Sequence, residues 1–315
     1  MEPILNIVLP VFAIVAAGYA CGAGKVLGEE SSAALNGFVY WVALPAMLFR
    51  AMATVEVAQL WQPDFLIGFL TPLLAIWLAA IVAARFLFRR TLAEAAIHGM
   101  NGVYGNSGYM GIPLAVAAFG EAAAVPAVVA TVINTAVVVG IAVGLIEAGS
   151  KTGNGGFQVL VNILRRMARN PMLIAPLLGL AWAFTGLDLP VPLDSFTGIL
   201  GSAAGPCALF AIGLFMVGKP RSEGRMEVGV MTAVKLIGQP AGTALAFFWL
   251  LPVDPLWAKV AVLMAALPTG AGSFVLAQAY GIYVLRTSSA ILLGTVLSVV
   301  TISIYFIVFP PIVGG

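Results

Sequence analysis

The chain has 315 residues, of which 61% are hydrophobic and only 9% are charged, and its mean hydropathy is +1.06. Because a soluble globular domain carries roughly 25% charged residues, this composition excludes a soluble domain and predicts an integral membrane protein. The formal net charge of +2 gives no reason to expect nucleic acid as a partner. Two distant cysteines and a single histidine form neither a disulfide framework nor a metal cluster, so we expect no metal and no cofactor.

Apolar segments near the length that crosses a bilayer, about 20 residues, follow one another along the whole chain. They lie at about residues 4–23, 34–53, 64–88, 96–119, 123–146, 171–187, 196–217, 228–250, 256–280 and 288–311. The sequence therefore predicts an all-α fold of ten transmembrane helices.

The basic residues predict the orientation of these spans. Most of the 15 Lys and Arg residues fall in the odd-numbered connections, for example Arg89 and Arg90 after span 3 and Arg165 and Arg166 after span 5. Since Lys and Arg accumulate in cytoplasmic loops, the odd connections are predicted to be cytoplasmic. Both termini then lie outside, on the periplasmic side of an inner membrane.

The predicted spans divide into two groups of five. A Gly-rich connection separates them, so we expect a first repeat at residues 1–147, a cytoplasmic linker at 148–170 and a second repeat at 171–315. Five is an odd number, which requires the two repeats to be inverted relative to each other. Within the linker, the apolar spacing of residues 157–169 beside basic side chains predicts an interfacial helix.

The fourth span contains residues that interrupt a helix. Its middle carries Gly105, Asn106, Ser107, Gly108, Gly111 and Pro113. Glycine weakens a helix and proline removes a backbone donor, and inside a bilayer such a break persists only where protein or a water-filled cavity satisfies the backbone. The ninth span has a corresponding break at Pro268, Thr269, Gly270 and Gly272. Paired breaks in two halves are the pattern of a transporter binding site.

The polarity of the two breaks favours an anion. We expect the half-helices after the breaks to begin at about Gly111–Pro113 and Gly270–Gly272, so that two positive helix ends converge on one point. No Asp or Glu lies in the middle of a span, which argues against an antiporter that uses intramembrane carboxylates. The alternative is that these glycines and prolines only allow helices to pack closely.

Further polar residues lie inside the spans. Lys235 is the one ionisable residue well inside a span, and its ammonium group either snorkels to the cytoplasmic interface or provides a charge near the site. Asn134 and Gln239 can form hydrogen bonds between helices. The sequence Gly105-Asn-Ser107-Gly108 matches the G-x-S-G motif of intramembrane serine proteases. The only histidine, His98, lies on the same span, about 13 Å away along the helix, so we expect no enzyme.

Several segments resemble the auxin efflux carrier family, which includes plant carriers and bacterial malonate and malate transporters. The segment Asn106-Ser-Gly-Tyr-Met-Gly-Ile-Pro113-Leu is similar to the family's N-x-x-x-M-G-I-P-L crossing motif. Arg169-Asn-Pro171, Gly213-Leu-Phe-Met216 and Ala266-Leu-Pro-Thr-Gly270 match further motifs in the family's order.

This resemblance implies a fold like that of the bile-acid sodium symporters, with helices 4 and 9 broken and crossing, a scaffold domain and a moving transport domain. It also implies a homodimer in the lipid membrane, an elevator mechanism and a small organic anion as substrate. By the motif, Asn106 and Pro268 lie at the crossing, while Asn134 and Lys235, with Gln239 beside them, form a supporting site. Span 3 lacks the acid that would relay protons, and the sodium-binding carboxylates of the symporters are absent.

The predicted function is secondary transport of a mono- or dicarboxylate such as malonate, malate or an auxin-like anion. Two alternatives are a sodium-coupled symporter and a membrane receptor that binds the anion without moving it.

Overall fold

The structure is a computed structural model, and it describes residues 9–55, 57, 62–149, 161, 165, 168–218 and 224–310. Within these ranges the regular elements are helices, and the β-type contact recorded there is an isolated bridge between Gly105 and Thr269. The predicted all-α fold is confirmed for the part of the chain that the structure describes.

In the first half, several helices continue into one another through π-helical turns. The elements are α1 (Leu9–Ala23), α2 (Glu29–Phe38), a π turn (Val39–Ala43), α3 (Leu44–Ala53), α5 (Pro63–Phe86), α6 (Leu92–Val103), a π turn (Ser107–Gly111), α7 (Ile112–Phe119), a 3-10 turn (Glu121–Ala123), α8 (Ala124–Ile133), a π turn (Asn134–Val139) and α9 (Gly140–Gly149). The fourth predicted span is therefore broken between α6 and the turn that precedes α7.

The second half has a similar series. It contains α11 (Pro171–Ala183), α12 (Val191–Ser202), α13 (Ala204–Met216), α14 (Arg225–Ala233), a π turn (Val234–Gly238), α15 (Gln239–Leu245), a π turn (Ala246–Leu250), α16 (Pro255–Ala266), α17 (Ala271–Tyr280) and α18 (Val284–Val308). The ninth predicted span is broken between α16 and α17.

Five helical stretches have the length and composition that cross a membrane. They are Glu30–Ala53, Pro63–Phe86, Glu121–Ile146, Val191–Met216 and Val284–Val308, and shorter apolar helices include Phe12–Ala23, Ser107–Phe119, Pro171–Ala183 and Pro255–Ala266. Several apolar helices of this kind make the chain a multi-pass membrane protein. The predicted interfacial helix at residues 157–169 and most of the predicted linker lie outside the described residues.

Local capping fixes where the two half-helices that lead into the breaks begin. At α6, Thr91 and Glu94 form a reciprocal capping box. The Thr91 amide donates to the Glu94 carboxylate at 2.9 Å, and the Glu94 amide donates to the Thr91 hydroxyl at 3.3 Å. At α16, the Asp254 carboxylate accepts from the Leu256 amide at 2.9 Å, and Pro255 takes the first helical position. Both half-helices therefore start at a defined residue.

The helices pack in two groups. In one, α1 packs along α13, α3 packs along α11 and α12, and α2 lies against α13. Glycines make these contacts close, because a Cβ at Gly18 would meet the Phe210 carbonyl and a Cβ at Gly179 would meet the Phe49 carbonyl. In the other group, α5, α6 and α9 pack together, α15 lies on α5 and α16, and α14 lies on α18.

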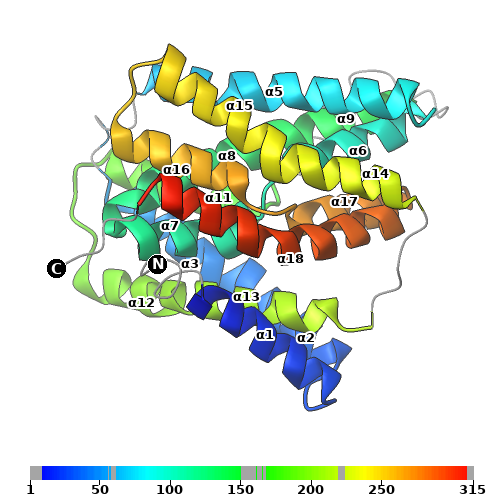
Figure 1. Cartoon of the computed structure of the whole chain (residues 1–315). Helices are drawn as coiled ribbons and strands as arrows, with labels where there is room; N and C mark the ends of the chain where they lie inside the picture. Colours follow the sequence, from blue (N-terminus) through cyan, green and yellow to red (C-terminus); the bar gives the residue numbers. More distant parts are fainter. Residues whose placement is uncertain are drawn as a thin grey trace.

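The broken helices lie in the core of the molecule. Figure 1 shows α16 and α17 in the middle of the view, between α5 and α15 above and α1 and α13 below. Every residue of α6 from Ala95 to Val103 is buried, and so is every residue of α16 from Val260 to Ala266. Protein therefore surrounds both breaks, which is the condition under which irregular backbone is stable at membrane depth.

Candidate substrate-binding site

The two breaks cross and satisfy each other's backbone groups. The Asn106 amide donates to the Pro268 carbonyl at 2.8 Å, and the Gly270 amide donates to the Tyr104 carbonyl at 2.9 Å. These bonds flank the antiparallel bridge between Gly105 and Thr269. The crossing is thus a minimal two-stranded contact that replaces the hydrogen bonds lost where each helix stops.

Glycine is needed where the two backbones meet. A Cβ on Gly270 would lie 2.7 Å from the Gly105 carbonyl oxygen, and a Cβ on Gly105 would lie 3.0 Å from the Met264 carbonyl oxygen. The Thr269 hydroxyl adds a bond of 2.8 Å to the Asn101 carbonyl, one turn back in α6. Thr269 and Pro268 therefore build the crossing itself.

The second half-helix of the ninth span begins where the sequence predicts, with Gly270 before Ala271. The one in the fourth span begins earlier than predicted, at Ser107 and not near Gly111–Pro113. Its first turn is a π turn in which the Met110 and Gly111 amides both bond the Asn106 carbonyl. This wider turn continues into α7 and lets Pro113 sit in the helix, so proline does not mark the break here.

A cavity of about 610 Å³ opens beside the crossing. Five of the predicted site residues line it, namely Asn106, Ser107, Gly108, Gly270 and Gly272. Gly111, Pro113, Pro268 and Thr269 are not among the described residues that line it. Gly111 faces Leu267, since a Cβ there would lie 2.5 Å from the Leu267 side chain, and Pro113 packs against Gly205. These two residues hold the half-helix in place.

Most of the cavity wall comes from residues that the sequence did not single out. Aromatic and aliphatic side chains form much of the wall, and polar groups lie among them. The aromatic residues are Tyr40, Trp41, Tyr104, Tyr109, Phe215 and Phe274, and the polar ones include Asn36, Thr135, Arg169, Asn170 and Gln278. Arg169, Asn170 and Phe215 lie in segments that resemble the family, whereas no signal in the sequence marked Tyr40, Trp41 or Tyr104.

Lys235 does not snorkel. It is fully buried, and its Nζ donates to the Gln239 side-chain oxygen and to the Ala265 carbonyl, each at 2.6 Å. Ala265 lies in the last turn of α16, where the helix dipole is negative, so the ammonium group binds the carboxyl end of the half-helix that leads into the crossing. Lys235 and Gln239 therefore support the crossing from outside the cavity.

The polar position in span 5 is a pair of residues. Asn134 and Thr135 begin a π turn and are both buried. In the described structure, the Asn134 side-chain oxygen is buried without a hydrogen-bond partner. The Thr135 hydroxyl lies on the cavity wall within hydrogen-bonding reach of the Tyr104 hydroxyl. Two hydroxyl groups therefore lie together on the cavity wall, where a ligand can accept hydrogen bonds from them.

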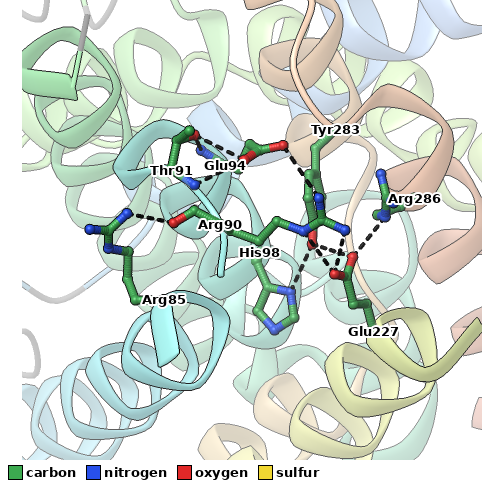
Figure 2. A network of polar contacts seen from close by, with 8 residues as sticks. All are labelled: Arg85, Arg90, Thr91, Glu94, His98, Glu227, Tyr283 and Arg286. Atoms are coloured by element: carbon green, nitrogen blue, oxygen red, sulfur yellow. Dashed lines mark hydrogen bonds and ion pairs between the residues drawn. The ribbon is translucent and has the colours of Figure 1, made fainter. Parts of the chain in front are cut away.

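A separate polar network lies at the end of α6 opposite the crossing. Figure 2 shows the Glu227 carboxylate between the guanidinium groups of Arg90 and Arg286, at 2.6 and 2.7 Å. The Tyr283 hydroxyl donates to Glu227 at 2.6 Å, so its oxygen accepts from His98 Nδ1 at 3.3 Å. Burial alone would raise the pKa of Glu227, but the hydrogen bonds from Tyr283 and Arg90 and the charges of both arginines lower it. The network ties α6, α14 and α18 together.

Comparison with known proteins agrees with this architecture. The model of the family described as "Membrane transport protein" matches residues 3–155 and 156–306. A "Putative malonate transporter" of Rhizobium meliloti (strain 1021) is 34% identical over 303 residues, which cover 96% of this chain and 95% of that protein. An "Uncharacterized transporter YfdV" of Escherichia coli (strain K12) is 26% identical over 93% of both chains.

A plant protein is also similar over part of the chain. "Auxin efflux carrier component 3a" of Oryza sativa subsp. japonica is 30% identical over 175 residues, which cover 50% of this chain and 28% of the plant protein. The family model spans nearly the whole sequence, and the relative from Rhizobium meliloti matches end to end. The chain therefore belongs to the auxin efflux carrier family of membrane transport proteins.

Proposed function

We propose that this transporter moves small organic anions and binds their carboxylate at the crossing. The observation that carries the proposal is the meeting of two half-helix N-termini, at Ser107 and Ala271, on one cavity. The first amides of a helix have no acceptor within it and lie at the positive end of its dipole. Two such ends at one point, arriving from separate spans, form an anion site without requiring a buried cation.

The side chains of the cavity agree with an anion. Among the described residues that line it, none is Asp or Glu, and Arg169 lies at its exposed part. Asn106 and Ser107 supply polar side chains at the first N-terminus, and the Tyr104 and Thr135 side chains line the same space. A cation would meet positive helix ends and no counter-charge, so the same geometry disfavours it.

Two observations bear on the substrate. The relative with 34% identity is named a putative malonate transporter, which favours a short dicarboxylate. The aromatic and aliphatic wall of a cavity of about 610 Å³ favours an anion with an apolar body, because a three-carbon dicarboxylate would leave most of that wall uncovered. Malonate and indole-3-acetate represent these two classes and are the first substrates to test.

The mechanism that we propose is alternating access of the elevator type. Ten spans in two inverted repeats would place the crossing at mid-membrane, and the two packing groups of helices would serve as scaffold and moving domain. Arg169 and Gln278 line the cavity from segments that the basic residues orient towards the cytoplasm, so the cavity would face the cytoplasm. We further propose a homodimer in the inner membrane with both termini on the periplasmic side.

Counterflow into proteoliposomes tests transport. Vesicles loaded with unlabelled malonate or indole-3-acetate are diluted into the same labelled anion, and transport predicts a transient accumulation of label that empty liposomes do not show. Replacement of sodium by choline should leave it unchanged, since no sodium-binding carboxylate is evident in the spans. Binding of the anion without counterflow would indicate a receptor. Accumulation that collapses in choline would indicate a sodium symporter.

A further inference from the structure

We propose that Tyr104 is a substrate-binding residue, whose hydroxyl donates a hydrogen bond to the substrate carboxylate beside the first amides of α17. This inference rests on the proposed function, because it places the carboxylate at the crossing. It adds a residue that lies in the break itself, immediately after the last residue of α6. It also gives a reason for the glycine at position 272.

The backbone of the crossing fixes where the Tyr104 ring lies. The Tyr104 carbonyl accepts from the Gly270 amide at 2.9 Å, which holds the residue against the start of α17. The ring covers the first turn of that helix: a Cβ on Gly272 would lie 2.8 Å from both the ring carbon Cε1 and the hydroxyl oxygen, and a Cβ on Gly270 would lie 3.0 Å from Cε1. The ring therefore occupies the space that side chains at 270 and 272 would need.

The hydroxyl lies where a bound carboxylate needs donors. The Ser273 amide bonds the Gly270 carbonyl, so the amides of Ala271 and Gly272 are the first of α17 and have no acceptor within the helix. Tyr104 is 7% exposed and lines the cavity together with Gly270 and Gly272. A phenol on this turn adds a donor of fixed direction to the two amides.

A second hydroxyl group lies on the cavity wall at the same place. Thr135 reaches this wall from the π turn of span 5, is 2% exposed, and its hydroxyl lies within hydrogen-bonding reach of the Tyr104 hydroxyl. A carboxylate has two oxygens that accept several hydrogen bonds, so the amides of α17, Tyr104 and Thr135 can all be used by one group.

The test separates the hydroxyl from the ring. Binding of [14C]malonate and indole-3-[14C]acetate to the full-length protein in detergent is compared between wild type and Tyr104→Phe, which keeps the ring. Loss of a hydrogen bond to a charged group predicts affinity weakened by about tenfold with an unchanged melting temperature. Tyr305→Phe is the matched control, since that buried tyrosine donates to the Lys259 carbonyl away from the cavity.

A second pair of variants tests the contact with Gly272. Gly272→Ala should weaken binding because its Cβ displaces the Tyr104 ring, whereas Gly229→Ala should not, because no heavy atom lies within 4 Å of a Cβ there. In a Tyr104→Ala background, which has already lost the hydroxyl and the ring, Gly272→Ala should cause no further loss. Additive losses would contradict the contact.

The outcomes distinguish the inference from the function on which it rests. Wild-type binding of either anion, with Tyr104→Phe binding equally well, overturns the role of the hydroxyl and leaves the proposed function standing. Wild type that binds neither anion overturns the proposed function, and the role of Tyr104 falls with it.

Discussion

At the scale of single residues, the site depends on glycines and on a few buried polar groups. Gly105 and Gly270 are required because two backbones meet there without room for a Cβ. Asn106 has a double role. Its backbone bonds the Pro268 carbonyl and the amides of the next turn, while its side chain is available on the cavity wall. Substitution of the side chain therefore separates binding from architecture.

Asn106→Ala should abolish measurable binding of the substrate anion while the melting temperature stays within about 2 °C of wild type, because the backbone bonds remain. The measurement is equilibrium binding of labelled malonate and indole-3-acetate, with a thermal melt of the same sample. Wild-type affinity in this variant would refute the placement of the carboxylate at Ser107.

Lys235 has a different role, since it supports the crossing without reaching the cavity. Lys235→Met leaves the Ala265 carbonyl and the Gln239 oxygen without their donor and should lower the free energy of unfolding by about 2 kcal/mol. Lys259→Met, at a half-buried lysine, is the matched control and should change the stability little. Equal melting temperatures for the two variants in detergent would show that the buried ammonium group does not stabilise the crossing.

At the scale of elements, the sequence predicted which helices break and where the ninth span resumes, but not where the fourth span resumes. Gly111 and Pro113 favoured a second half-helix that starts near mid-span. In the structure, α6 ends just before Tyr104, because the extended residues that follow must pair with Pro268–Gly270 of the other half. The π turn from Ser107 to Gly111 then leads into α7, which accommodates Pro113 near its start. A register of this kind depends on a partner distant in sequence, which local propensity cannot reveal.

The network around Glu227 is the element-scale feature that sequence reasoning missed, because its members come from α14, from α18 with the residue before it, and from α6 with the segment before it. Glu227→Gln leaves two guanidinium groups facing a neutral amide and should lower the stability by about 2 kcal/mol at pH 7. The measurement is thermal unfolding in detergent. A variant as stable as wild type would show that the network does not stabilise the packing of these helices.

The Glu227 carboxylate makes the stability of the protein depend on pH, and its pKa gives the direction of that dependence. Its pKa in the folded protein lies below the ordinary value of 4.5, so the stabilisation is complete above about pH 5 and is lost as the pH falls through 4.5 towards the folded pKa. The stability difference between wild type and Glu227→Gln should therefore narrow as the pH is lowered from 7 to 4. A difference that stays constant would mean that Glu227 is not the group responsible.

At the scale of the whole molecule, the composition and the succession of apolar segments were enough to predict the class of protein, the positions of the helices and the pairing of the two breaks. They were enough because a bilayer demands long apolar helices, and because a broken helix at membrane depth needs a partner. The wall of the cavity was not predictable in the same way. Tyr40 and Trp41 line the cavity because of how distant helices pack, and nothing in their own segment distinguishes them.

The central claim is that backbone amides at two helix ends, and not a charged side chain, select the anion. Arg169 is the one cationic residue among the described residues that line the cavity, so the direct test is Arg169→Gln. We measure the affinities of this variant and of wild type for malonate and indole-3-acetate and for their uncharged amides, malonamide and indole-3-acetamide. The account predicts that Arg169→Gln still prefers the anion to its amide by at least about tenfold. Equal affinity for anion and amide in this variant would contradict it.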